Sequence, residues 1–136
     1  MTPEDLAATH DAAFTMSRAW SAAEFASLLE APGVILCGDA RSYVLGRMIL
    51  DEAEVLTVAT APAFQKQGLA TAALGDFAAQ AASAGVTSVF LEVADDNNTA
   101  KALYKKINFK ISGRRRAYYT RKDGPAVDAL IMRKEL

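Results

Sequence analysis

A short loop at residues 65–70, Gln-Lys-Gln-Gly-Leu-Ala, has the composition of an anion-binding site. It lies between a predicted buried strand and a predicted helix, which brings unpaired backbone N–H groups and the positive end of a helix dipole together. Gly68 has no Cβ and Ala70 has a small side chain, so a phosphate could approach the main chain closely. The loop is neither a Walker loop nor a G-x-G-x-x-G fingerprint. Alone, the loop indicates either a pyrophosphate site or a strand-to-helix turn in which Gly68 only provides conformational freedom.

Glu92 and Tyr104 are the side chains best suited to proton transfer. Glu92 lies near the carboxyl end of an otherwise largely apolar predicted strand, where ligands of open α/β sheets bind. The alternative for Glu92 is a strand-end carboxylate that points to solvent. Tyr104 shares a helical stripe with Ala100 and is either a proton donor or a core aromatic residue with its hydroxyl at the edge.

The chain has one cysteine, Cys37, and one histidine, His10, which excludes several other chemistries. They allow no intrachain disulfide and no cluster of Cys and His ligands for a structural zinc ion. A catalytic thiol needs an adjacent base, and no motif links His10 to Cys37. We therefore expect Cys37 to be buried in a strand and His10 to lie on the surface or between helices.

The composition is that of a globular protein, and we expect a single domain over residues 1–136. Hydrophobic residues make up 51% of the chain and charged residues 23%. The net charge of −1 provides no basic surface for nucleic acid or an anionic membrane. The N-terminus does not resemble a signal peptide, and no apolar run approaches the ~20 residues that span a bilayer. These features predict a cytoplasmic protein with neither nucleic acid nor membrane as partner.

Four helices are predicted to position the candidate residues. The first covers residues 3–13, with Pro3 in its first turn. The second begins at Ser21, which forms a capping box with Glu24, and stops near residue 32. The third starts at residue 69, carries apolar residues at every fourth position and ends at Gly85. The fourth follows the capping residues 95–97 and closes at Asn108, a residue that tolerates the left-handed conformation.

Six strands are predicted from short runs of β-branched and aromatic residues, at 33–37, 42–50, 53–60, 86–93, 109–119 and 126–135. Gly38-Asp39 and Asp51-Glu52 separate the first three, and Asp123-Gly124 is a turn signal between the last two. The strand at 53–60 is apolar at every position except Glu54, Thr57 and Thr60, so we expect it to be central and covered on both faces. The order predicts a mixed α/β sheet with helices on its faces.

Two motifs in register resemble those of the GCN5-related N-acetyltransferases, the GNAT family. The segment VATAPAFQKQGLATAAL resembles motif A, [QR]-x-x-G-x-[GA], with Gln65, Gly68 and Ala70 at the signature positions. The segment NNTAKALY, followed by Asn108-Phe109, resembles N-x-x-A-x-x-L-Y…G-F, with Asn in place of the glycine. The resemblance covers nearly the whole chain. It implies the GNAT fold, a central, mixed and mostly antiparallel sheet flanked by helices.

Within the family, DEAEVLTVAT, Leu91-Glu92-Val93 and RRRAYYTRKDGPAVDALIM look most like the bacterial ribosomal-protein-alanine N-acetyltransferases, the RimI type. This resemblance implies transfer from acetyl-coenzyme A to a protein N-terminal α-amine, such as that of a ribosomal protein, in a ternary complex and without a metal. One alternative is an acetyltransferase acting on a small-molecule amine or an amino acid. Another is a non-catalytic module that binds acyl-coenzyme A, although the presence of both Glu92 and Tyr104 argues against it.

The resemblance also implies roles for individual residues. Glu92 would be the general base and Tyr104 the general acid. The main chain of Val58 to Thr60 would bind the pantetheine arm, and Asn97 would touch the cofactor or, as we favour, cap its helix. The pyrophosphate would be held by backbone N–H groups of Gln65, Lys66, Gln67, Gly68, Leu69 and Ala70. The basic run 114–116 would be a solvated edge, or would meet the 3′-phosphate of coenzyme A or an acidic peptide, and Tyr118 and Tyr119 would line an acceptor groove.

Overall fold

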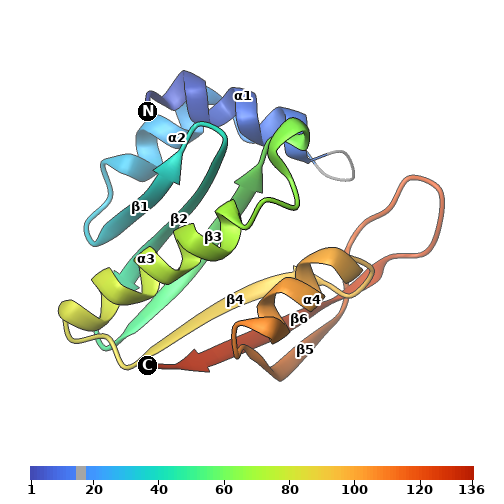
Figure 1. Cartoon of the computed structure of the whole chain (residues 1–136). Coiled ribbons are helices and arrows are strands. Elements are labelled where there is room, and N and C mark those ends of the chain that lie inside the picture. The colour runs from blue at the N-terminus through green and yellow to red at the C-terminus, as the bar shows by residue number, and fades with distance from the viewer. Residues whose placement is uncertain (15–17) are drawn as a thin grey trace.

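A six-stranded sheet in the order β1-β2-β3-β4-β6-β5 forms the centre of the computed structural model, which describes residues 1–14 and 18–136 (Figure 1). Neighbouring strands are antiparallel except for the parallel pair β3 and β4. The predicted fold class and element order are confirmed. The elements are α1 (Pro3–Ala13), α2 (Ala22–Leu29), β1 (Val34–Asp39), β2 (Ser42–Ile49), β3 (Glu52–Thr60), η1 (Pro62–Phe64), α3 (Leu69–Ser83), β4 (Ser88–Ala94), α4 (Asn98–Lys106), β5 (Lys110–Tyr119) and β6 (Val127–Glu135).

Side-chain caps mark the beginning of α1, α2 and α4. Ser21 forms the predicted capping box with Glu24, and a second box, between Thr2 and Asp5, opens α1. Asn108 has φ 75°, as predicted for the residue that closes α4. The prediction of a turn at residues 38–39 is wrong, because β1 continues through Asp39 and the hairpin turn lies at residues 40–41.

Two hydrophobic clusters cover the two faces of the sheet. Along β1, Ile35 and Cys37 belong to the cluster beneath α3 and α4, whereas Leu36 packs with α1 and α2. This alternation places α3 and α4 on one face and α1 and α2 on the other (Figure 1). Among the described residues, no helix is both long and apolar enough to cross a membrane.

A one-residue bulge in β3 changes which face its side chains contact. Leu45 of β2 pairs with Thr57, but the next residue of β2 pairs with Val55, so Leu56 is left without a partner. Before the bulge, the odd-numbered residue Val55 packs under α3. After the bulge, the even-numbered residue Val58 packs on that face, and Ala59 packs against α1 and α2. β3 is central and contributes to both clusters, as predicted.

Candidate active site

Strands β3 and β4 separate part of the way along their length. Their pairing ends at Glu54 and Phe90, although β3 continues to Thr60 and β4 to Ala94. The separation begins just before the bulged residue Leu56, and a bulge bends the strand that carries it. Segments 55–60 and 91–94 therefore border an opening in the middle of the sheet.

The main chain of β3 presents hydrogen-bonding groups to this opening. Ala61 donates its backbone N–H to Arg41 O at 2.8 Å, which identifies residues 61 and 59 as the ones directed at β2. Backbone groups of successive residues in a strand point in opposite directions. The N–H and C=O groups of Val58 and Thr60, which alternate with residues 59 and 61, therefore point away from β2 and toward β4. Thr60 O accepts a bond from Gln65 Nε2 at 3.4 Å, in agreement with that direction. The two residues predicted to bind a ligand through their main chain thus face the opening.

The loop at 65–70 lies at the start of α3 and is exposed up to Gly68. Gly68 is the N-cap of α3, with φ 79°, and has no side chain to occupy the first N–H groups of the helix. A Cβ built on Gly68 would meet nothing within 4 Å. The positive φ favours glycine at this position. The absence of neighbouring atoms leaves the space in front of the helix open to a ligand.

Tyr104 is the buried residue of α4, and its side chain belongs to the cluster that α3 also covers. Its ring packs edge-on against Phe109, with 5.8 Å between the ring centroids. Burial, and to a smaller extent the charge of Tyr119, together raise the pKa of the Tyr104 hydroxyl to about 12. The hydroxyl is therefore protonated at neutral pH, in the state that a general acid requires.

Glu92 projects from the face of β4 that points away from α3 and α4. Its neighbours Leu91 and Val93 belong to the cluster that contains Tyr104, so the side chain between them points the other way. The Glu92 side chain is 25% exposed, and its Oε1 lies 3.1 Å from Nε of Arg115 on β5. The carboxylate of Glu92 and the hydroxyl of Tyr104, the two candidate groups for proton transfer, thus lie on opposite sides of β4.

An irregular stretch of β5 gathers aromatic side chains near Glu92. The register of β5 against β6 shifts between Arg115 and Tyr119, where Ala117 has φ 51° and donates its N–H to Asp128. The Arg115 guanidinium lies 5.3 Å from the centroid of the Tyr118 ring. Burial raises the pKa of Tyr119, and the negative charge of Glu92 acts in the same direction.

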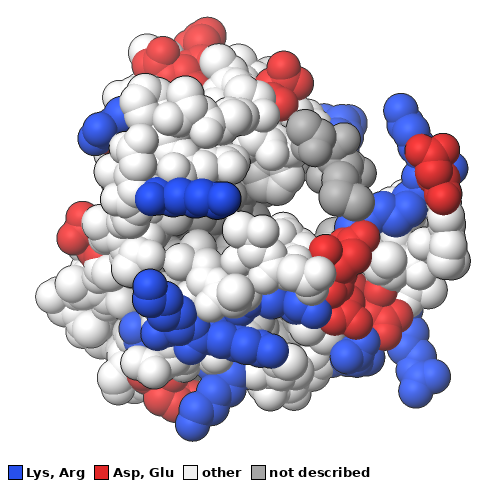
Figure 2. Space-filling model, turned by 45° about the vertical axis from the view of Figure 1, so that its right-hand side comes forward, with Lys and Arg blue, Asp and Glu red and all other residues white. Residues whose placement is uncertain are grey.

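Ion pairs hold the β5–β6 hairpin to the turn between β4 and α4. Arg114 contacts both Asp95 and Asp128, at 3.0 and 2.7 Å, and Lys101 contacts Asp95 at 2.9 Å. Figure 2 shows acidic side chains bordered by Lys and Arg on the right-hand side of that view. Sequence reasoning treated residues 114–116 as one basic run, but Arg114 and Arg115 have different acidic partners.

A bidentate pair joins Arg121 of the hairpin loop to Asp96, with both N–O distances at 2.9 Å. Sequence reasoning missed it because the two residues lie far apart along the chain. Asn97, in the same turn, accepts the N–H of Ala100 at 3.2 Å and so caps α4, as we favoured.

Cys37 and His10 lie on opposite faces of the sheet. Cys37 is buried in the cluster under α3, where burial raises the pKa of its thiol. His10 lies between the helices of the other face, stacked on Phe14 and Trp20. The sheet separates thiol from imidazole, so they cannot form a catalytic pair. Among residues 1–14 and 18–136, no group of three His, Cys, Asp or Glu side chains is placed to hold a metal ion.

Comparisons with known proteins show which family and fold this chain resembles. The model of the acetyltransferase (GNAT) family matches residues 7–109. The [ribosomal protein bS18]-alanine N-acetyltransferase of Escherichia coli (strain K12) is 36% identical over 95 residues, which cover 70% of this chain and 64% of that enzyme. The chain thus matches slightly less than two thirds of that relative's length.

Solved structures show the same fold. The ribosomal-protein-S18-alanine N-acetyltransferase from Escherichia coli superposes with a TM-score of 0.87 at 29% identity, over 98% of this chain and 86% of that one. Ard1 from Thermoplasma volcanium gives a TM-score of 0.82 at 25% identity, over 100% and 94%.

His10 makes the stability of the fold sensitive to mild acid. It is 2% exposed, its Nδ1 accepts the N–H of Trp20 at 3.1 Å, and burial lowers its pKa. The unfolded chain then binds more protons than the folded one below the ordinary histidine pKa of about 6.5. We expect the free energy of unfolding to fall as the pH drops from 7 to 5.5, measured by urea denaturation. The chain has no other histidine, so His10→Gln should remove this slope; an unchanged slope would contradict the assignment.

Proposed function

This chain belongs to the acetyltransferase (GNAT) family, and we propose that it transfers an acetyl group from acetyl-coenzyme A to a primary amine, in particular the N-terminal α-amine of a protein. The observation that carries this proposal is the opening between β3 and β4, where the main chain of Val58 and Thr60 has no strand partner along one edge. The loop that ends at Gly68 lies at the end of the same edge.

The described residues fit the donor. An extended pantetheine arm could pair with the main chain of Val58 and Thr60 as a further strand would. A pyrophosphate in front of Gly68 would meet the unpaired N–H groups of α3, whose dipole favours negative charge there. Acetyl-coenzyme A supplies the acetyl group as an activated thioester. We assign Gln65, Lys66, Gln67, Gly68, Leu69 and Ala70 to its pyrophosphate.

The two faces of β4 support direct transfer in a ternary complex. Tyr104 lies on the face covered by α3 and α4, and Glu92 on the other. We propose that Glu92, directly or through a water, accepts the proton that the acceptor ammonium must lose. The protonated Tyr104 hydroxyl then donates its proton to the departing sulfur. We propose no acyl-cysteine intermediate, since the sheet keeps Cys37 apart from the only histidine, His10.

The chemistry of Glu92 favours an N-terminal α-amine over a lysine side chain. An α-amine has an ordinary pKa of about 8 and a lysine about 10.4, so more of the α-amine is neutral near pH 7. A single carboxylate then suffices as base. The name of the Escherichia coli relative, an alanine N-acetyltransferase acting on ribosomal protein bS18, points to the same class of acceptor.

Gly68 provides a test of the donor site. Wild-type protein should gain about 2.7 kcal/mol of stability when acetyl-coenzyme A is present at 100 times its Kd, seen as a raised melting temperature. Gly68→Asn should fold, because asparagine tolerates a positive φ, but its side chain would fill the space before the helix and reduce the shift. Gly85→Asn is the matched control: Gly85 also has a positive φ and open space, but follows the other end of α3. Equal shifts in both variants would place the pyrophosphate elsewhere.

Tyr104→Phe tests the proton donor. The change removes only the hydroxyl, so acetyl-coenzyme A affinity should stay near wild type while kcat falls about 10²–10⁴-fold, as is typical for loss of a general acid. Tyr43→Phe is the control, since Tyr43 is also buried but donates its hydroxyl to Leu6 O in the other cluster. It should lower stability and leave kcat unchanged. A Tyr104→Phe enzyme with normal kcat would make Tyr104 a packing residue.

Two peptides of one sequence test the acceptor. One carries a free N-terminal alanine, and the other has that end blocked and contains an internal lysine. We expect faster acetylation of the first, measured by mass spectrometry over time. Faster modification of the blocked peptide would reject the N-terminal assignment and leave the acetyltransferase proposal standing. Turnover of small amines alone would favour the small-molecule alternative, and acetyl-coenzyme A binding without any transfer would favour a non-catalytic module.

A further inference from the structure

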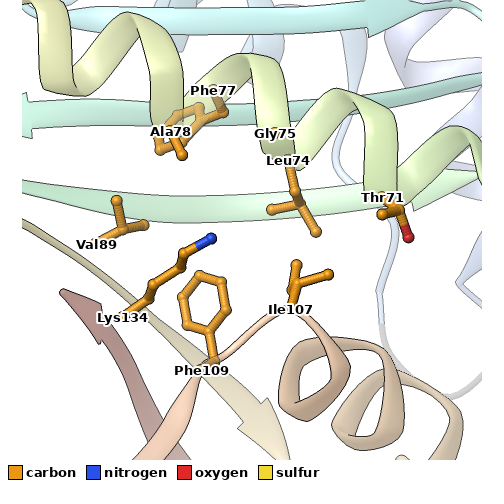
Figure 3. A pocket seen from close by; sticks show the side chains of 9 residues that line it. All are labelled: Thr71, Leu74, Gly75, Phe77, Ala78, Val89, Ile107, Phe109 and Lys134. Atoms are coloured by element: carbon orange, nitrogen blue, oxygen red, sulfur yellow. The ribbon is translucent and has the colours of Figure 1, made fainter. Parts of the chain in front are cut away.

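We propose that the cleft between α3 and the end of α4 binds a small amphiphilic carboxylate, an anion with one carboxylate on an apolar body the size of benzoate. The cleft has a volume of about 150 Å³ and is lined by side chains of α3, β4, β6 and the segment that follows α4 (Figure 3). The proposal is independent of the donor and acceptor assignments above.

Apolar side chains form most of the wall. Leu74, Val89 and Phe109 are at most 4% exposed, and Ile107 completes the side formed by the end of α4. A cavity of this size lined by leucine, isoleucine and phenylalanine stays dry in another protein and binds benzene. The body of the ligand is therefore expected to be a ring or a short alkyl chain.

Lys134 gives the cleft its charge selectivity. Figure 3 shows its side chain running past Phe109, with the ammonium nitrogen directed between Val89 and Leu74. Within the described part of the chain, no carboxylate lies at ion-pair distance from Lys134 Nζ. An ammonium group that faces apolar walls without a counter-ion gains a short, charge-assisted hydrogen bond when a carboxylate binds beside it.

The cleft has its own entrance and lies apart from the opening in the sheet. Gly75 and Thr71 of α3 are exposed, and a Cβ on Gly75 would meet nothing within 4 Å, so a ligand can enter beside this helix. Val89 pairs with Ala53, in the part where β3 and β4 are still joined. The opening begins only after that paired segment.

Benzoate is the probe, and benzyl alcohol is its uncharged match. We expect intermolecular NOEs from the benzoate ring to the methyl groups of Leu74, Val89 and Ile107. Benzyl alcohol should bind about tenfold more weakly, because its hydroxyl carries no negative charge to pair with the Lys134 ammonium. Saturating acetyl-coenzyme A should leave these NOEs in place. Displacement by acetyl-coenzyme A, or absence of the NOEs at any benzoate concentration up to solubility, would overturn the proposal.

Two variants separate the charge from the cavity. Lys134→Met keeps the length of the side chain and removes its charge, so it should weaken benzoate about tenfold and benzyl alcohol much less. Gly75→Leu should fill the cleft and abolish binding of both probes. Lys106→Met, a change of the same type on the exposed side of α4, is the control and should bind benzoate like the wild type. Equal benzoate affinity in Lys134→Met and Lys106→Met would reject carboxylate recognition.

Discussion

Leu56 is an extra residue in β3 relative to β2, and the arrangement of the candidate site follows from this bulge. Without it, Val58 would point to the face of α1 and α2, because one residue of slip exchanges the two faces of a strand. The bulge also bends β3, and its pairing with β4 ends just before the bend. The main chain of Val58 and Thr60 thus remains without a strand partner on that side. A regular strand would have used those groups in the sheet.

Alternation along β4 adds a second constraint. Because successive residues of a strand point to opposite faces, Glu92 cannot share a face with Leu91 and Val93, which pack in the same cluster as Tyr104 of α4. A donor bound from the helix-covered face and an acceptor bound from the other would meet at this strand. The separation of β3 from β4 is what allows the two to touch through the sheet. The fold thereby supports transfer without a covalent intermediate.

Local signals were sufficient to predict most of the fold. Ser21 with Glu24, and Asn97 before α4, are short-range caps whose partners lie within three residues, and both were found from sequence. The bulge at Leu56 has no comparable signal, since it depends on register against β2 and not on residue type. The pair of Glu92 and Arg115 joins separate strands, and the left-handed Ala117 that shifts β5 is a residue for which that conformation is unfavourable. These features follow from the assembled sheet.

The arginine residues of the β5–β6 hairpin fix its position more than they contribute to the free energy of folding. Exposed ion pairs contribute only about 0–1 kcal/mol each, so the contacts of Arg114 with Asp95 and Asp128 add little to the free energy of folding. They nevertheless fix the hairpin against the turn that leads into α4. Arg121 does so more firmly, because its side chain is only 13% exposed and both of its bonds reach the carboxylate of Asp96. Since the same hairpin carries Arg115, these contacts also hold the strand whose guanidinium lies 3.1 Å from Glu92, the carboxylate to which the proposed reaction assigns the acceptor's proton.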